Sequence, residues 1–232
     1  MKLSGKPHTH PRVIYVTASG ASARSFLIPH FQALSAQGYN VYLSSCNDPE
    51  ANDAVQQAKI KHLPIALKTH ISILSDILAL ARLTFYFLKF RPAVVHGHMS
   101  KAGLISMIAS TVCRVKFRIY HNHGMACFSS RGITRRLLVT IERTSCLLAT
   151  EVIFCSESTK QLAIDLRICN AKKAKVIGGG TISGVDITHY SPEQAYIESL
   201  RLVKNTPALS SNKNYVAFVG RVVAHKGIDT LI

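Results

Sequence analysis

Two groups of side chains in this sequence have the types and the spacing needed for chemistry, and the first is a pair of cations beside a glycine. Arg221 directly follows Gly220, and Lys226 stands five residues after Arg221. The apolar run 215–219 predicts a buried strand before them, and the run 228–232 predicts the first turn of a helix after them. Such a turn suits a phosphate, because the backbone comes close, the helix N-terminus is partly positive and both cations donate hydrogen bonds. The alternative is an ordinary strand-to-helix turn with a solvated Arg and Lys.

The second group consists of two histidine pairs, His96 with His98 and His121 with His123. The spacing within each pair places two imidazoles on one face of a strand. Four imidazoles are able to bind zinc, which gives one hypothesis, a histidine-ligated zinc hydrolase, although no carboxylate ligand is evident near either pair. For His123 the alternative is a structural histidine whose hydrogen bonds are satisfied at a strand end.

Strands alternating with helices must position these residues. Apolar runs predict strands over residues 12–17, 40–45, 60–65, 93–97, 116–121, 151–155 and 175–177. Helical periodicity predicts helices over residues 25–37, 71–90, 100–114, 134–148 and 157–167. This alternation predicts an α/β fold, a doubly wound and mostly parallel sheet of the Rossmann-like type.

The loop after the first predicted strand contains Ser19 and Gly20, at the edge where open α/β sheets bind ligands. The chain has no G-x-G-x-x-G fingerprint there, so a dinucleotide site is not expected. Weak periodicity over 181–214, with Pro192 and Pro207, indicates an interdomain connection. We therefore predict a first domain over residues 1–190, a linker over 191–213 and the beginning of a second domain over 214–232.

The composition indicates a folded protein with anionic partners. Hydrophobic residues make up 47% of the chain and charged residues 17%, which excludes a disordered chain. The formal charge of +16 favours sugar nucleotides, phospholipid headgroups, lipid-linked pyrophosphates or nucleic acid. No nucleic-acid recognition motif accompanies the charge, so nucleic acid is not the expected partner.

The pattern of cysteines and apolar segments indicates a cytoplasmic protein. None of the six cysteines forms a C-x-x-C pair, which predicts free thiols in a reducing compartment. We expect neither a signal peptide nor a transmembrane span. The apolar stretch 71–90 is flanked by cations, so it predicts either a helix buried on the sheet or an amphipathic surface on an anionic membrane.

Five motifs in one order resemble retaining glycosyltransferases of family 4, which have the GT-B fold. They are VVHGHMSKAG at 94–103, YHNHG at 120–124, VIFCSE at 152–157, VIGGGTISGVD at 176–186, and FVGR at 218–221 followed by Lys226-Gly227. The resemblance spans nearly all of the chain. Its glycine-rich stretch before Gly-Val-Asp is similar to that of enzymes that build capsule, lipopolysaccharide O-antigen and other bacterial surface polysaccharides.

The resemblance implies roles for particular residues. Arg221 and Lys226 match the positions that grip the diphosphate of a nucleotide sugar, and His123 matches the cleft histidine that contacts the transferred sugar or stabilises an oxocarbenium-like state. Ser19 and Gly20 match the acceptor cleft loosely. His98 and Lys101 are candidates to contact an anionic acceptor, the alternative being a loop with solvated charge. No metal or cofactor is implied besides the nucleotide-sugar co-substrate.

The resemblance also implies transfer of a sugar, with retention of configuration, to a lipid-linked or polysaccharide acceptor at the inner face of the cell membrane. The family's pair of glutamates in the donor domain would follow the last residue of these 232. We therefore expect these residues alone to lack transferase activity. The competing hypothesis is a non-catalytic domain that binds the acceptor or a lipid.

Overall fold

The computed structural model describes residues 10–67, 72–128, 130–188, 190, 191, 193, 218–220, 222 and 228–231. The chain divides into two compact units, Met1–Ser183 and Gly184–Ile232. The boundary falls just after the glycine-rich stretch, slightly before the predicted limit at residue 190. The functional roles of the two parts stay predictions.

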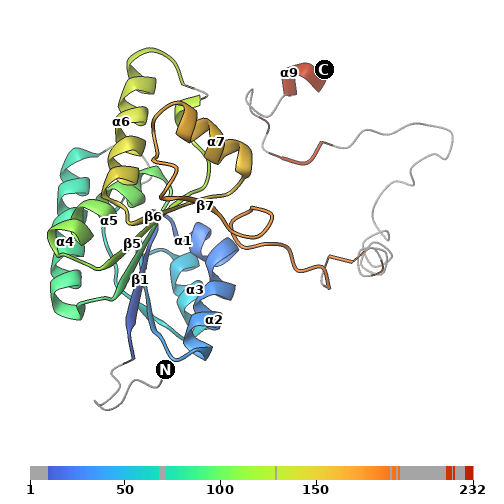
Figure 1. Ribbon diagram of the computed structural model, residues 1–232. Helices are drawn as coiled ribbons and strands as arrows, with labels where there is room; N and C mark the ends of the chain where they lie inside the picture. Colours follow the sequence, from blue (N-terminus) through green and yellow to red (C-terminus); the bar gives the residue numbers. More distant parts are fainter. Residues whose placement is uncertain are drawn as a thin grey trace. The chain divides into compact units, whose positions relative to one another are not determined.

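The first unit is built on one parallel sheet in the order β3-β2-β1-β4-β5-β6-β7 (Figure 1). Its strands are β1 Arg12–Val16, β2 Asn40–Ser44, β3 Lys61–His62, β4 Val94–His98, β5 Phe117–Asn122, β6 Glu151–Phe154 and β7 Ala174–Val176. The order reverses between β1 and β4, the point where open α/β sheets bind ligands beyond the carboxyl ends of their strands. The predicted doubly wound, Rossmann-like α/β fold is confirmed.

Helices cover both faces of this sheet. They are α1 Gly20–Ser22, the π-helix η1 Ala23–Leu27, α2 Ile28–Ala36, α3 Pro49–Ala58, α4 Ile73–Phe90, α5 Ser100–Val112, the 3-10 helix η2 Ala126–Phe128, α6 Gly132–Leu148 and α7 Glu157–Asp165. Alternation along β1 sends Val13 and Tyr15 to a core with η1, α2 and α3, while Ile14 and Val16 enter a second core with α4 to α7. Both faces of β1 are therefore packed in a hydrophobic core.

The structure corrects two predictions about helices. The predicted helix 25–37 begins earlier, at Gly20, and consists of α1, η1 and α2. The helix α3 was missed because its buried side chains are alanines, which give little hydrophobic periodicity: Ala51, Ala54 and Ala58. A cap compensates, since the carboxylate of Asp48 accepts a hydrogen bond of 2.7 Å from the amide of Ala51.

The second unit is described at only a few positions. Phe218 and Val219 lie outside any strand, and the side chain of Val219 is 96% exposed, so the buried strand predicted over 215–219 is wrong at these residues. A strand needs a neighbour for its backbone hydrogen bonds, and the described residues of this unit contain no strand that could pair with one at Phe218 and Val219. The helix α9, Ile228–Leu231, lies where a helix start was predicted. Arg221 and Lys226 lie outside the described residues.

Candidate active site

The two histidine pairs meet on one face of the sheet. Strands β4 and β5 are parallel neighbours, with His98 level with His121 and His96 level with Ile119. Residues that are level with each other on neighbouring strands point to the same side of the sheet, as do residues two positions apart on one strand. The imidazoles of both pairs therefore converge. Tyr15 of β1 pairs with His96 and adds its ring to the same face, with its centroid 4.9 Å from that of His96.

The imidazoles are in direct contact. The ring centroids of His96 and His98 are 4.2 Å apart, and the centroid of His121 lies 5.2 Å from that of His98 and 5.0 Å from that of His123. Nδ1 of His98 and Nε2 of His123 are joined by a hydrogen bond of 3.0 Å. We call His96, His98, His121 and His123 the histidine cluster.

Burial makes the cluster electrically neutral. His96, His98 and His121 are each less than a tenth exposed, whereas His123 is half-buried. Burial lowers the pKa of His96 and of His98 well below 6.5, and the neighbouring histidines lower both further. Burial likewise lowers the pKa of His121 to about 3 and that of His123 to about 4. At neutral pH the four rings are therefore uncharged, and His123 is the most open of them.

A buried carboxylate supports the strand end that carries His123. Glu142 of α6 is 1% exposed and accepts hydrogen bonds from the hydroxyl of Tyr120, at 2.7 Å, and the side-chain amide of Asn122, at 2.9 Å. The hydroxyl of Ser100 donates to its other oxygen. Burial raises the pKa of Glu142, and these three hydrogen bonds oppose the rise. The carboxylate thus ties β5 and α5 to α6.

The glutamate also reaches the loop after β5. The side-chain oxygen of Asn122 accepts a hydrogen bond of 2.9 Å from the backbone amide of Gly124, which encloses His123 in a short turn. Glu142 therefore fixes the backbone that presents His123. Sequence reasoning missed it. The available signal was its spacing, because Glu142 lies four residues from Leu138 and from Cys146, both of which face the core.

The glycine between the two histidines of β4 is explained by close packing. A Cβ atom at Gly97 would lie 2.0 Å from the hydroxyl oxygen of Ser106 and 3.2 Å from the Cα of Gly103. Helix α5 therefore packs directly on β4 with no room for a side chain. In the H-G-H motif, the glycine is explained by this packing, and the two-residue spacing of the histidines places their imidazoles on the same face.

Three predicted site residues have structural partners. The hydroxyl of Ser19 accepts a hydrogen bond of 3.2 Å from the amide of Ala21 and caps α1. Lys101 pairs with Asp76 of α4, with 2.7 Å between nitrogen and oxygen, and joins α5 to α4. His98, predicted to touch an acceptor, is fully buried and contacts His123 instead.

Gly20 lies at the start of α1, and its amide donates a hydrogen bond of 3.1 Å to Asp48. A Cβ atom there would lie 1.9 Å from an oxygen of Asp48 and 2.3 Å from the amide nitrogen of Ala51. We expect Gly20→Ala to lower the free energy of unfolding by about 2 kcal/mol, because α3 must shift and its cap weakens. Urea unfolding measures this change. Gly179→Ala is the matched control, since a Cβ atom there meets nothing within 4 Å; equal stabilities of the two variants would contradict the prediction.

The family follows from comparison with known sequences. Residues 30–181 match Glycosyltransferase Family 4. The chain belongs to this family. The capsular polysaccharide biosynthesis glycosyltransferase CapM of Staphylococcus aureus is 29% identical over 174 residues, which cover 75% of this family 4 chain and 44% of CapM.

Solved structures of other proteins have a similar fold. Anabaena HepE, crystallised with UDP and glucose, superposes with a TM-score of 0.62 at 20% identity, over 84% of this chain and 50% of HepE. Sucrose-phosphate synthase from Thermosynechococcus elongatus superposes with a TM-score of 0.63 at 14% identity, over 96% of this chain and 58% of that protein. The family 4 chain thus spans about half the length of the proteins it matches, and at these identities the superpositions show the fold alone.

Proposed function

We propose that this family 4 chain takes part in the transfer of a sugar from a nucleotide sugar to a lipid-linked or glycan acceptor, with retention of configuration, in the synthesis of a cell-surface polysaccharide. The observation that carries the proposal is the position of His123 beside the switch point between β1 and β4, in a chain of this family. Two relatives support the substrate class: CapM is named for capsular polysaccharide biosynthesis, and HepE was crystallised with UDP and glucose.

The geometry supports a specific role for His123. The hydrogen bond to His98 occupies Nε2 of His123, so Nδ1 remains for a ligand in either tautomer. A neutral imidazole in that position would hydrogen-bond a hydroxyl of the transferred sugar. It would thereby stabilise the oxocarbenium-like state that forms as the glycosidic bond breaks. In the proposed reaction, Arg221 and Lys226 would stabilise the leaving diphosphate, Ser19 and Gly20 would border the acceptor, and no metal is required.

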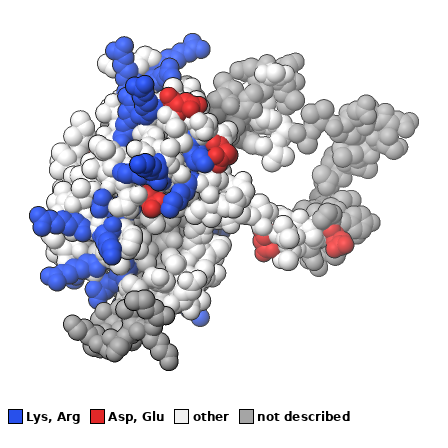
Figure 2. Space-filling model, viewed as in Figure 1, with Lys and Arg blue, Asp and Glu red and all other residues white. Residues whose placement is uncertain are grey.

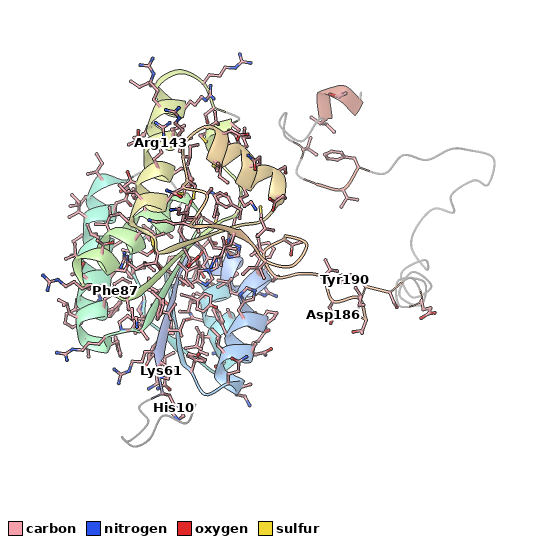
Figure 3. The ribbon with its side chains drawn as sticks, in the orientation of Figure 1. His10, Lys61, Phe87, Arg143, Asp186 and Tyr190 are labelled. Carbon is pink, nitrogen blue, oxygen red and sulfur yellow. The ribbon has the colours of Figure 1, made fainter. Side chains whose placement is uncertain are left out.

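The test is a hybrid enzyme in which this chain replaces the matched part of CapM. We expect the folded hybrid to transfer label from a nucleotide sugar to a lipid-linked acceptor, and the 232 residues alone to give no turnover. His123→Ala in the hybrid should lower kcat by about 100-fold, the loss expected when one transition-state hydrogen-bond donor is removed. His10→Ala is the control, because His10 is exposed and lies at the amino end of the sheet with Lys61 (Figure 3). A folded hybrid that binds the nucleotide sugar without transferring it would overturn the proposal.

We further propose that the protein binds the anionic inner face of the cell membrane through α4. No helix in the described part of the chain is long and apolar enough to cross a membrane. Helix α4 nevertheless exposes six large apolar side chains, each more than half accessible to solvent: Ile73, Leu74, Ile77, Leu78, Phe85 and Leu88. An exposed apolar stripe of this length favours insertion into the headgroup region.

Charge around this stripe supports a membrane surface as its occupant. The exposed cations Arg82 and Lys89 lie on α4, and Arg91 follows it. Figure 2 shows Lys and Arg side chains gathered along this side of the first unit and over α6. Each cation near an anionic bilayer adds roughly 1 kcal/mol, so the apolar stripe and the cations act together.

Replacing Leu74 and Ile77 together with aspartate should weaken binding to vesicles that contain an anionic phospholipid by at least about 10-fold, because two inserted side chains are lost. Vesicle flotation measures the bound fraction. Leu147→Asp on α6 is the control, since Leu147 is 74% exposed but lies outside the α4 stripe. Binding that is unchanged in the double variant, or equally strong with zwitterionic vesicles, would refute a docking role for α4.

A further inference from the structure

The histidine cluster contains more buried lone pairs and N–H groups than its own hydrogen bonds satisfy. Among the described residues, no hydrogen-bond partner reaches Nε2 of His96, Nε2 of His98 or either ring nitrogen of His121. Each of these atoms has almost no contact with solvent. A buried polar atom without a partner costs roughly 1–3 kcal/mol, so three such rings side by side indicate a site for something that accepts their lone pairs.

We propose that His96, His98 and His121 form a binding site for a divalent transition-metal ion of the zinc class. One ring nitrogen from each residue lies within 4.8 Å of the other two. Zinc–nitrogen bonds of about 2.1 Å place ligands about 3.4 Å apart in a tetrahedral site, so ring shifts of about an ångström complete the geometry. Imidazole nitrogen suits zinc, copper and nickel, whereas magnesium and calcium require oxygen ligands.

The hydrogen bond between His98 and His123 fits this assignment. If His98 binds the ion through Nε2, its proton is on Nδ1 and is donated to Nε2 of His123. Metal-binding histidines are usually oriented in this way by a partner on the second ring nitrogen. His123 is then a positioning residue for the site, not a ligand.

The ligand set also predicts what completes the site. Three uncharged imidazoles leave the +2 charge of the ion uncompensated. Three-histidine zinc sites hold a water molecule or an anionic oxygen at a fourth, open position. The site shares the hydrogen bond between His98 and His123 with the proposed transfer reaction, but that reaction itself requires no metal.

The experiment is metal titration of the purified, untagged and chelator-treated chain. Calorimetry with Zn²⁺ and visible spectroscopy with Co²⁺ should both give one ion per chain, and Co²⁺ should show the absorption of tetrahedral nitrogen coordination. His121→Gln should lower the Zn²⁺ affinity by about 100-fold or more, and His123→Gln by about 10-fold, as expected for a ligand and for its positioning partner. His10→Gln, at the opposite end of the sheet, should leave the affinity unchanged.

Circular dichroism establishes whether each variant is folded. If a buried variant is not, nitrogen NMR of the wild-type imidazoles decides, because Zn²⁺ should shift one nitrogen in each of three rings and slow its exchange. Absence of stoichiometric binding by Zn²⁺, Co²⁺ and Cu²⁺ to the folded wild type would overturn the proposal. Full affinity in a folded His121→Gln chain would also overturn it. Neither readout depends on transferase activity, so failure of the metal site and failure of the proposed function are distinguishable.

Discussion

Replacing Glu142 with alanine is expected to lower the free energy of unfolding by about 3–5 kcal/mol, because each buried donor that loses its acceptor costs roughly 1–3 kcal/mol and a cavity adds to the loss. The change leaves the hydroxyl of Tyr120 and the amide of Asn122 without their acceptor in a region with almost no solvent. It also opens a cavity between α6 and β5. Urea unfolding followed by circular dichroism measures the loss, which is large compared with the 5–15 kcal/mol stability of a typical domain.

Two further variants separate the hydrogen bonds from packing. Glu142→Gln keeps the shape and one acceptor oxygen, so we expect a loss of about 1–2 kcal/mol. Glu157→Ala, at an exposed position in the first turn of α7, should change stability by less than about 1 kcal/mol. If Glu142→Ala were as stable as Glu157→Ala, the carboxylate would not organise the end of β5.

Acid should destabilise the metal-free protein well above the pH at which carboxylates protonate. In the unfolded chain each histidine titrates near pH 6.5, whereas burial lowers the pKa of His96 and His98 well below that value and that of His121 to about 3. Between these values the unfolded chain binds more protons than the folded chain, so stability falls as pH falls below 6.5. Each buried histidine contributes about 1.4 kcal/mol per pH unit once the unfolded chain is fully protonated.

Counting the three histidines that are less than a tenth exposed, the loss between pH 6.5 and pH 5 is about 4–5 kcal/mol. Glu142 has the opposite effect on stability. Its pKa is raised in the folded chain, so as the pH falls the folded chain binds this proton before the unfolded chain does. Urea unfolding at a series of pH values in the presence of a chelator measures the slope. His96→Gln should reduce the slope of unfolding free energy against pH by about 1.4 kcal/mol per pH unit, the contribution of one proton. A free energy of unfolding that stays constant from pH 7 to pH 5 would contradict the prediction.

Residue types and their short-range spacing predicted most of the fold. Apolar strands with β-branched residues, separated by helical segments, predicted six of the seven strands to within two residues at each end. Helices α4, α5, α6 and α7 were predicted because large apolar residues recur in them at helical spacing. The third strand is shorter than predicted, Lys61–His62, and α3 was missed since alanine gives a weak apolar signal.

The candidate site was likewise predicted only in part from the sequence. The H-x-H spacing by itself indicated that each pair of imidazoles shares a strand face, since side chains alternate along a strand regardless of the rest of the fold. The sequence could not place one pair against the other, because that contact depends on β4 and β5 being parallel neighbours with His98 level with His121.

Sequence alone therefore determined the α/β class, the family resemblance and the histidines as candidate chemistry, because these depend on residue types and short spacings. Tertiary structure decided which of those residues are accessible to a ligand. His98 is buried, Lys101 forms an ion pair with Asp76, and His123 is half-buried at the edge of the histidine cluster. It also decided that Glu142, on a helix that follows β5 in the chain, supports the strand end beside His123. The physical reason is that burial and pairing arise from contacts between residues far apart in the chain, which no local pattern encodes.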